Sequence, residues 1–323
     1  MLCEKQKYDP GAKELILTNP RVVNGSQTLH SIRDVPHPSD KARVMVRIIQ
    51  IPPVADNDLA EQVTYKKEIV RKIAVRSNQQ NPIKKWDLVS NDDFQLELYR
   101  YFRQKGYFYE RRQGEWQQRS RGLKNVGTRL RRGPGIKKST QLIASFYWNK
   151  KKLGPAIAKQ EVGELFEGET YDLICETPVE LVYQIYLVND DLEGAYWELA
   201  NSKRYIAYLK GHINLTLLAV VAKTLKAAGA DWGKEEFSQL LEKQREQWWG
   251  WGGYSAPWRK LTKACIDHIV THYKKEARAV YKAEGYEPTY PNYFKNQSYV
   301  AKILNAPIPG TLTKLARKVL QIK

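Results

Sequence analysis

The chain has 323 residues, 42% of them hydrophobic, and 53 Lys and Arg against 35 Asp and Glu give a formal net charge of +18. This composition is sufficient for a hydrophobic core, and no run of eighteen apolar residues is present that would favour a membrane span. Three distant cysteines without a CxxC pair support neither a disulfide framework nor a zinc ribbon, so we expect a cytoplasmic protein. The excess of positive charge favours a polyanionic partner, most simply nucleic acid.

The N-terminal third reads as short strands followed by two helices. β-branched and apolar residues predict strands at 15–17, 21–23 and 43–51, and a helix over 58–78. A second helix is expected over 90–106, with Ser90 or Asn91 as its cap and Gly106 as its stop. Its apolar face comprises Phe94, Leu98, Tyr101 and Phe102.

After Thr177 the pattern becomes helical, with helices expected over 203–229, 233–249, 259–285 and 311–321. A stretch rich in Trp and Gly, 248–258, is interpreted as rings inserted into a helix bundle, with a stacking platform as the alternative. We therefore expect an α+β fold: a small mixed β-sheet packed with helices in 1–177, and a mostly α-helical region in 178–323.

The positive charge is concentrated in the segment 100–138. It holds thirteen basic and two acidic residues, a net charge of +11, with six aromatic residues interleaved. Arginines can neutralise phosphates, and aromatic rings can stack on bases. The alternative is a solvated basic loop whose aromatic residues belong to the core. The candidate binding residues of segment 100–138 are Tyr109, Glu110, Arg111, Arg112, Trp116, Arg129, Arg131 and Arg132.

Two stretches rich in side-chain amides are further candidates. The first is a turn between a strand and a helix, where exposed backbone N–H groups attract phosphate; simple helix capping is the alternative. It comprises Asn24, Gly25, Ser26, Gln27 and Thr28. The second lies before Pro82, where amides suit recognition but also suit turns. Its candidates are Asn78, Gln80 and Asn81, with Asn91 following shortly after.

Catalytic and metal signatures are weak. Glu110 could bind a metal, act as a base or pair with an arginine, and pairing is the commonest of these. His268 and His272 have the i, i+4 spacing of a zinc pair, but the glutamate of HExxH is missing and no third ligand stands out. We therefore expect no metal and no cofactor, and leave enzymatic activity open.

Taken together, the three motif stretches resemble the AIPR family, the abortive phage infection proteins of bacteria. The family pattern of a VNGxQT turn, an SNxQNPxKxxDLxSND segment and a GxxYERRxGEW-like segment occurs here in that order. The resemblance covers about 15–175 and fades into the helical part.

Family members usually begin earlier, with an upstream region compared to restriction endonucleases, so the chain resembles the C-terminal portion of a longer protein. The resemblance implies an antiphage defence protein that contacts DNA or RNA, as the binding portion of a nuclease-like system. The alternative is a nonenzymatic module that senses a protein partner through its helical part. The missing N-terminal region is a further candidate partner.

Overall fold

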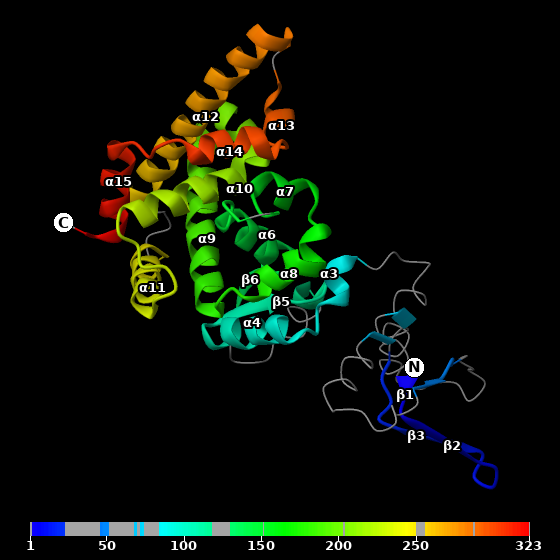
Figure 1. The fold of residues 1–323 in the computed structure, drawn as a ribbon. Helices are drawn as coiled ribbons and strands as arrows, with labels where there is room; N and C mark the ends of the chain where they lie inside the picture. Colours follow the sequence, from blue (N-terminus) through cyan, green and yellow to red (C-terminus); the bar gives the residue numbers. More distant parts are fainter. Residues whose placement is uncertain are drawn as a thin grey trace. The chain divides into compact units, whose positions relative to one another are not determined.

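The computed structural model describes residues 2–22, 46–51, 68–69, 72–73, 84–117, 130–150, 152–202, 204–249, 256–286 and 288–322. The chain divides into two compact units, Met1–Lys84 and Lys85–Lys323. The fold class is α+β, with a few short strands and a helical C-terminal region (Figure 1). Helices on both sides of Thr177, the boundary that we expected between domains, contribute to one hydrophobic core.

The described strands of the N-terminal unit form two separate two-stranded sheets. Strand β2 (Lys5–Asp9) pairs antiparallel with β3 (Glu14–Thr18), and β1 (Leu2–Cys3) pairs parallel with β4 (Ile49–Gln50). The Asp9 carboxylate accepts hydrogen bonds from two backbone N–H groups of the turn, at 2.9 and 3.2 Å, which fixes the turn locally.

These strands test the N-terminal predictions in part. The strand expected at 15–17 is confirmed as β3, and the one expected over 43–51 is reduced to β4 within 46–51. Arg21 forms only an isolated bridge with Leu2. Of the helix expected over 58–78, residues 68–69 and 72–73 are described and helical, and the others lie outside the described residues.

The second unit begins with helix α4 (Asp93–Gln104), preceded by the short α3 (Lys85–Leu88). The predicted apolar face is confirmed, since Phe94, Leu98 and Phe102 are buried. Gly106 follows with a φ of +79°, a conformation that favours glycine and ends the helix. The capping prediction is wrong: Asp92 occupies the N-cap, without a side-chain hydrogen bond.

Two strands lie where none was expected. β5 (Tyr107–Glu110) pairs parallel with β6 (Arg131–Gly135), with Tyr107 opposite Arg131 and Phe108 opposite Arg132. The strands expected at 15–17, 21–23 and 43–51 are therefore not the only ones in the described residues. A Cβ at Gly133 would lie 2.8 Å from the Phe108 carbonyl oxygen, so this glycine allows the strands to approach closely.

The remaining elements are helices, as predicted after Thr177. They are α6 (Ile136–Phe146), α7 (Pro155–Gln160), the 3-10 helix η2 (Glu164–Phe166), α8 (Gly168–Cys175), α9 (Val179–Ser202), α10 (Arg204–Ala227), α11 (Glu235–Trp249), α12 (Ala256–Glu284), α13 (Tyr290–Tyr293), α14 (Gln297–Asn305) and α15 (Gly310–Leu320). In Figure 1, α9 and α10 lie at the centre of this unit, and α12 extends past its neighbours at one end.

Aromatic residues join β5 to α4 and α9. The Phe102 ring lies 5.5 Å from that of Tyr109, 5.4 Å from that of Tyr183 and 5.5 Å from that of Tyr186, measured between centroids. Aromatic pairs in such geometry contribute about 0.5–1.5 kcal/mol each beyond their burial. These contacts fix β5, and with it the start of the turn that follows, against α4 and α9.

One described helical stretch, Tyr205–Ala227 in α10, is long and apolar enough to cross a membrane by length and composition alone. Most of it is buried against neighbouring helices, with Ile213, Leu218 and Leu225 fully covered. Burial of this kind is typical of a core helix in a globular protein.

Candidate functional site

Seven of the sixteen candidate binding residues are among the residues that the structure describes. The turn at Asn24, Gly25, Ser26, Gln27 and Thr28, the amides Asn78, Gln80 and Asn81, and Arg129 lie outside the described residues. Tyr109, Glu110, Arg111, Arg112, Trp116, Arg131 and Arg132 are described, and all belong to β5, to the turn after it or to β6.

Two glutamates build the turn that follows β5. One Glu110 carboxylate oxygen accepts hydrogen bonds from the backbone N–H groups of Gly114, at 2.9 Å, and Trp116, at 3.4 Å. One Glu115 oxygen accepts from the N–H groups of Arg111, at 3.0 Å, and Arg112, at 3.2 Å. Both acids therefore fix backbone geometry, much as capping residues do at a helix end.

The other Glu110 oxygen lies 3.8 Å from a guanidinium nitrogen of Arg132. Of the three roles considered for this residue, pairing with arginine is the one that the geometry shows. No group of three or more His, Cys, Asp and Glu that could hold a metal ion occurs among the described residues. His268 and His272 do lie together on α12, with ring centroids 4.5 Å apart.

The turn directs two arginines at a single acceptor. The side-chain oxygen of Asn91 accepts a hydrogen bond from Arg111 Nη1 and another from Arg112 Nη2, each 3.2 Å long. Arg111 Nη1 also donates to the Ser90 carbonyl oxygen at 3.2 Å. Two of the three motif stretches therefore meet here, since Asn91 belongs to the second and the arginines to the third.

Arg111 is the more firmly held of the two arginines. Its guanidinium carbon lies 5.0 Å from the centroid of the Tyr99 ring on α4, a cation–π contact. Its Nε is buried without a hydrogen-bond partner in the described structure, whereas the Arg112 side chain is exposed. The pair thus combines one anchored and one solvent-facing guanidinium.

Strand β6 carries two more arginines, which lie at the end of the sheet where β5 begins. Arg131 lies opposite Tyr107, its guanidinium carbon 6.0 Å from the ring centroid, and the Arg132 side chain is 64% exposed. The Tyr186 hydroxyl of α9 donates to the Arg132 carbonyl oxygen at 3.2 Å. Helix α9 thereby helps to fix the strand that carries both arginines.

The two aromatic candidates occupy different positions. Tyr109 is fully buried, and its hydroxyl donates to the Gln95 side-chain oxygen at 2.6 Å. Burial raises the pKa of this hydroxyl. The position argues for a core role, because neither face of the ring is open to a base. Trp116 is half-buried, with its ring centroid 5.6 Å from that of Phe108.

A buried cluster of charged side chains contacts β5 through the Tyr107 hydroxyl. Arg245 of α11 donates to Asp191 Oδ1 at 3.0 Å and to the Tyr107 hydroxyl at 3.0 Å, and it also pairs with Asp190. Burial raises the pKa of the Asp191 carboxyl to about 7, although the adjacent guanidinium acts in the opposite direction. The cluster ties β5 to α9 and α11.

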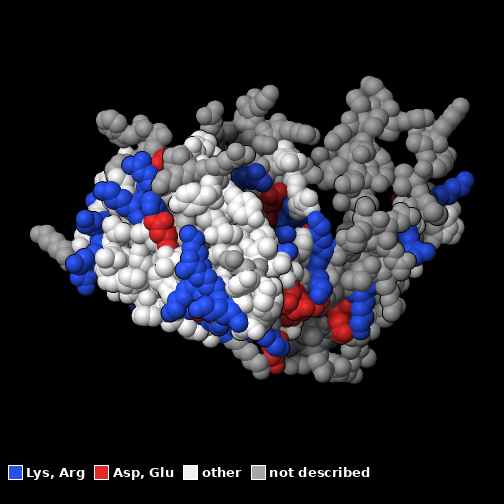
Figure 2. Space-filling view, turned by 90° about the horizontal axis from the view of Figure 1, so that it is seen from above, with Lys and Arg blue, Asp and Glu red and all other residues white. Residues whose placement is uncertain are grey.

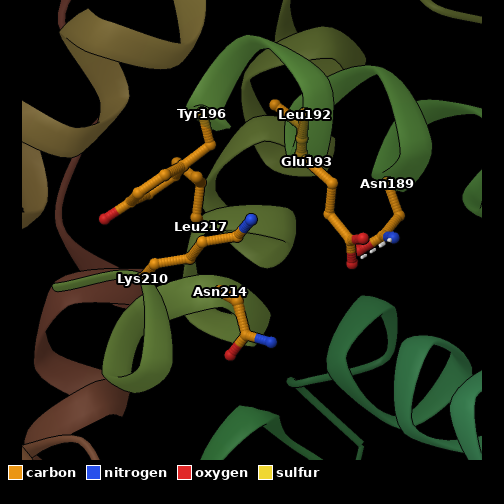
Figure 3. Close-up of a pocket in the computed structure, with 7 residues that line it drawn as sticks. All are labelled: Asn189, Leu192, Glu193, Tyr196, Lys210, Asn214 and Leu217. Atoms are coloured by element: carbon orange, nitrogen blue, oxygen red, sulfur yellow. Dashed lines mark hydrogen bonds between the residues drawn. The ribbon is translucent and has the colours of Figure 1, made fainter. Parts of the chain in front are cut away.

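A shallow pocket lies between α9 and α10 (Figure 3). Its polar lining includes Asn189, which donates to Glu193 at 3.0 Å, and Lys210. Glu193 also accepts from Lys138 of α6 at 2.7 Å, so its charge is already compensated. With room for about one water molecule, this pocket does not suit a substrate.

The positive charge is not restricted to β5 and β6. On the face that Figure 2 shows, Lys and Arg side chains form several separate groups, with Asp and Glu beside some of them. The arginines around Asn91 differ from a general basic surface because hydrogen bonds to the Asn91 side-chain oxygen and the Ser90 carbonyl oxygen order them.

The chain is similar to one known family. A model of the AIPR family, described as AIPR protein, matches residues 1–277. The match extends on both sides of the expected 15–175 and includes α9, α10, α11 and most of α12. The resemblance therefore does not fade into the helical part. Comparisons with curated proteins and with solved structures found no match.

Proposed function

Because the chain belongs to the AIPR family, we propose that it serves bacterial antiphage defence in the cytoplasm by interacting with nucleic acid. Family membership itself points to abortive infection. The nucleic-acid contact is the part of the proposal that the basic residues support.

The observation that carries the proposal is the presence of four arginines on the small β5–β6 sheet and on the turn that follows β5. Arg111 and Arg112 lie in the turn after β5, and Arg131 and Arg132 lie on β6. The two acids in the same stretch, Glu110 and Glu115, hold backbone N–H groups. The positive charge is therefore only partly compensated, which favours a polyanion.

Arginine suits this role for physical reasons. Its planar guanidinium can donate two parallel hydrogen bonds to phosphate and stays charged at every physiological pH. Each phosphate that it neutralises releases counterions from the nucleic acid, which drives binding at low salt. Trp116 in the same turn is half-buried and can contribute stacking.

The test compares two double variants that lose the same charge. Arg131→Ala with Arg132→Ala removes the β6 arginines, and Lys314→Ala with Arg317→Ala removes two exposed basic side chains from α15. Fluorescence anisotropy with single- and double-stranded DNA and RNA at low salt measures the affinity. The proposal expects a clear loss for the first variant only. Equal losses would reduce the interaction to general charge attraction, and no binding by the wild type would refute it.

A protein-sensing module remains the second candidate, because large aromatic side chains are exposed on the central helices. Trp197 of α9 is 59% exposed, and Tyr205 and Tyr208 of α10 are 50% and 58% exposed. Aromatic residues are enriched at protein interfaces. Binding to a phage or host protein that is insensitive to salt and lost in Trp197→Ala would favour this alternative.

A further inference from the structure

We propose that Asn91, Arg111 and Arg112 form a binding site for one phosphate group, held through two of its non-ester oxygens. The proposal rests on the proposed function, since it names the group of the nucleic acid that this part of the surface would contact. Within the basic surface of the proposed function, these three residues would form one defined site.

The first argument is the distance between the two positive groups. Both donor nitrogens lie 3.2 Å from the same Asn91 oxygen, so they are no further apart than twice that distance. Like charges this close repel each other. An amide oxygen accepts the two hydrogen bonds but carries no net charge, so it cannot neutralise the pair. An anion between the guanidinium groups would.

The second argument is the lack of a carboxylate partner. Three other described arginines reach one: Arg132 pairs with Glu110, Arg245 with Asp190 and Asp191, and Arg259 with Glu198. Within the described ranges, no carboxylate lies within ion-pair distance of the Arg111 or Arg112 guanidinium. The nearby Glu115 instead accepts from the backbone N–H groups of both.

The third argument is the supply of free donors. No acceptor is described for Arg111 Nη2, nor for Arg112 Nε and Nη1, and the Arg112 side chain is exposed, whereas Arg111 Nε is buried. The Ser90 carbonyl and the Tyr99 ring fix the Arg111 guanidinium, so little freedom is lost when an anion binds. A tetrahedral phosphate presents its oxygens at a separation that two arginine forks can bridge.

Exchange of Asn91 for aspartate separates this proposal from a purely structural role. Asn91→Asp retains the acceptor oxygen, the side-chain size and both arginines, but places a negative charge where the phosphate would lie. A structural tie would gain from this change, because charge-assisted hydrogen bonds are stronger. A phosphate site would be blocked by it. We therefore expect equal or greater thermal stability together with at least tenfold weaker binding.

Two further variants complete the series. Asn91→Ala keeps both positive charges but removes their common acceptor, so we expect weaker nucleic-acid binding with an unchanged dependence on salt. Arg112→Ala removes one phosphate contact from an exposed position and should lower the slope of log affinity against log salt by about 1. Arg317→Ala on α15, equally exposed, is the matched control and should leave the slope unchanged.

Inorganic phosphate supplies a probe that does not depend on nucleic acid. In thermal-shift titrations at constant ionic strength, phosphate should stabilise the wild type more than chloride does, and this difference should be absent in Arg112→Ala and Asn91→Asp. Oligonucleotides with and without a 5′-phosphate distinguish the source: a preference for the phosphorylated end indicates a terminal phosphate, and equal affinity indicates a backbone phosphodiester.

The possible failures can be told apart. If the wild type binds nucleic acid with a steep salt dependence and Asn91→Asp binds equally well, the phosphate site is wrong and the proposed function stands. If the wild type shows the phosphate-specific stabilisation but binds no nucleic acid, the proposed function is wrong and the site stands for another phosphate ligand. If phosphate and chloride act alike on the wild type, the site is refuted.

Discussion

The side-chain oxygen of Asn91 accepts one hydrogen bond from Arg111 and one from Arg112, and this contact joins two motif stretches about twenty residues apart. Its geometry depends on Glu115, whose carboxylate holds the backbone of both arginines.

Glu115→Ala should weaken nucleic-acid binding although it removes a negative charge. Loss of the carboxylate frees two backbone N–H groups and loosens the turn, at a cost of about 1–2 kcal/mol in the free energy of unfolding. Binding at low salt and urea denaturation measure the two effects. Glu97→Ala, which removes an exposed acid from α4, is the control and should bind as tightly as the wild type, or more tightly. A gain in affinity for Glu115→Ala would contradict the role of the turn.

Tyr109→Phe should reduce stability without changing affinity. The substitution leaves the Gln95 oxygen buried without the hydroxyl that donates to it at 2.6 Å, which costs about 1–3 kcal/mol. The urea midpoint and the dissociation constant for nucleic acid are the measurements, with the exposed Tyr281→Phe as control. A loss of affinity with unchanged stability would indicate that the Tyr109 hydroxyl contacts the nucleic acid, and would contradict its role in the core.

Arg245→Ala should be strongly destabilising. Its removal leaves Asp191 buried and Asp190 partly buried without their counter-charge, and breaking a buried pair from one side costs about 3–5 kcal/mol. Lys243→Ala, an exposed change on the same helix, should cost almost nothing. Similar urea midpoints for the two variants would show that the cluster does not stabilise the fold.

Asp191 should make stability depend on pH. Its carboxyl ionises near its ordinary value of 3.8 in the unfolded chain but has a pKa raised to about 7 in the folded protein. Between these values the unfolded chain binds fewer protons, so the contribution of Asp191 to the free energy of unfolding falls as pH rises from about 4 to about 7. Asp191→Asn cannot titrate and should flatten this part of the profile. Identical profiles for the two proteins would contradict the raised pKa.

The sequence predicts the helices well because their signals are local. The periodicity of Phe94, Leu98 and Phe102 and the glycine at position 106 define α4, and the long apolar run within 203–229 defines α10. Strand β6 carries no such signal, since Arg-Arg-Gly-Pro-Gly has no β-branched residue. It forms because Gly133 lets it approach β5, a contact between distant parts of the chain.

The candidate site, too, can be predicted from the sequence only in part. The cluster of arginines is visible in composition, and the amide of Asn91 is part of a recognisable motif. That the two meet depends on the β5 turn and on the packing of Tyr99 against Arg111, which no local pattern records. Tyr109 shows the converse, because an aromatic residue within a basic segment has the same sequence signature whether it lies at the surface or in the core.

The salt dependence of nucleic-acid binding tests the central claim most directly. If four or five arginines contact phosphate, log affinity should fall against log salt with a slope of about −3 to −4 for the wild type, and joint replacement of Arg129, Arg131 and Arg132 by Ala should flatten it by about 2. A wild-type slope near zero, or an unchanged slope in the triple variant, would contradict nucleic-acid binding and favour the protein-sensing module.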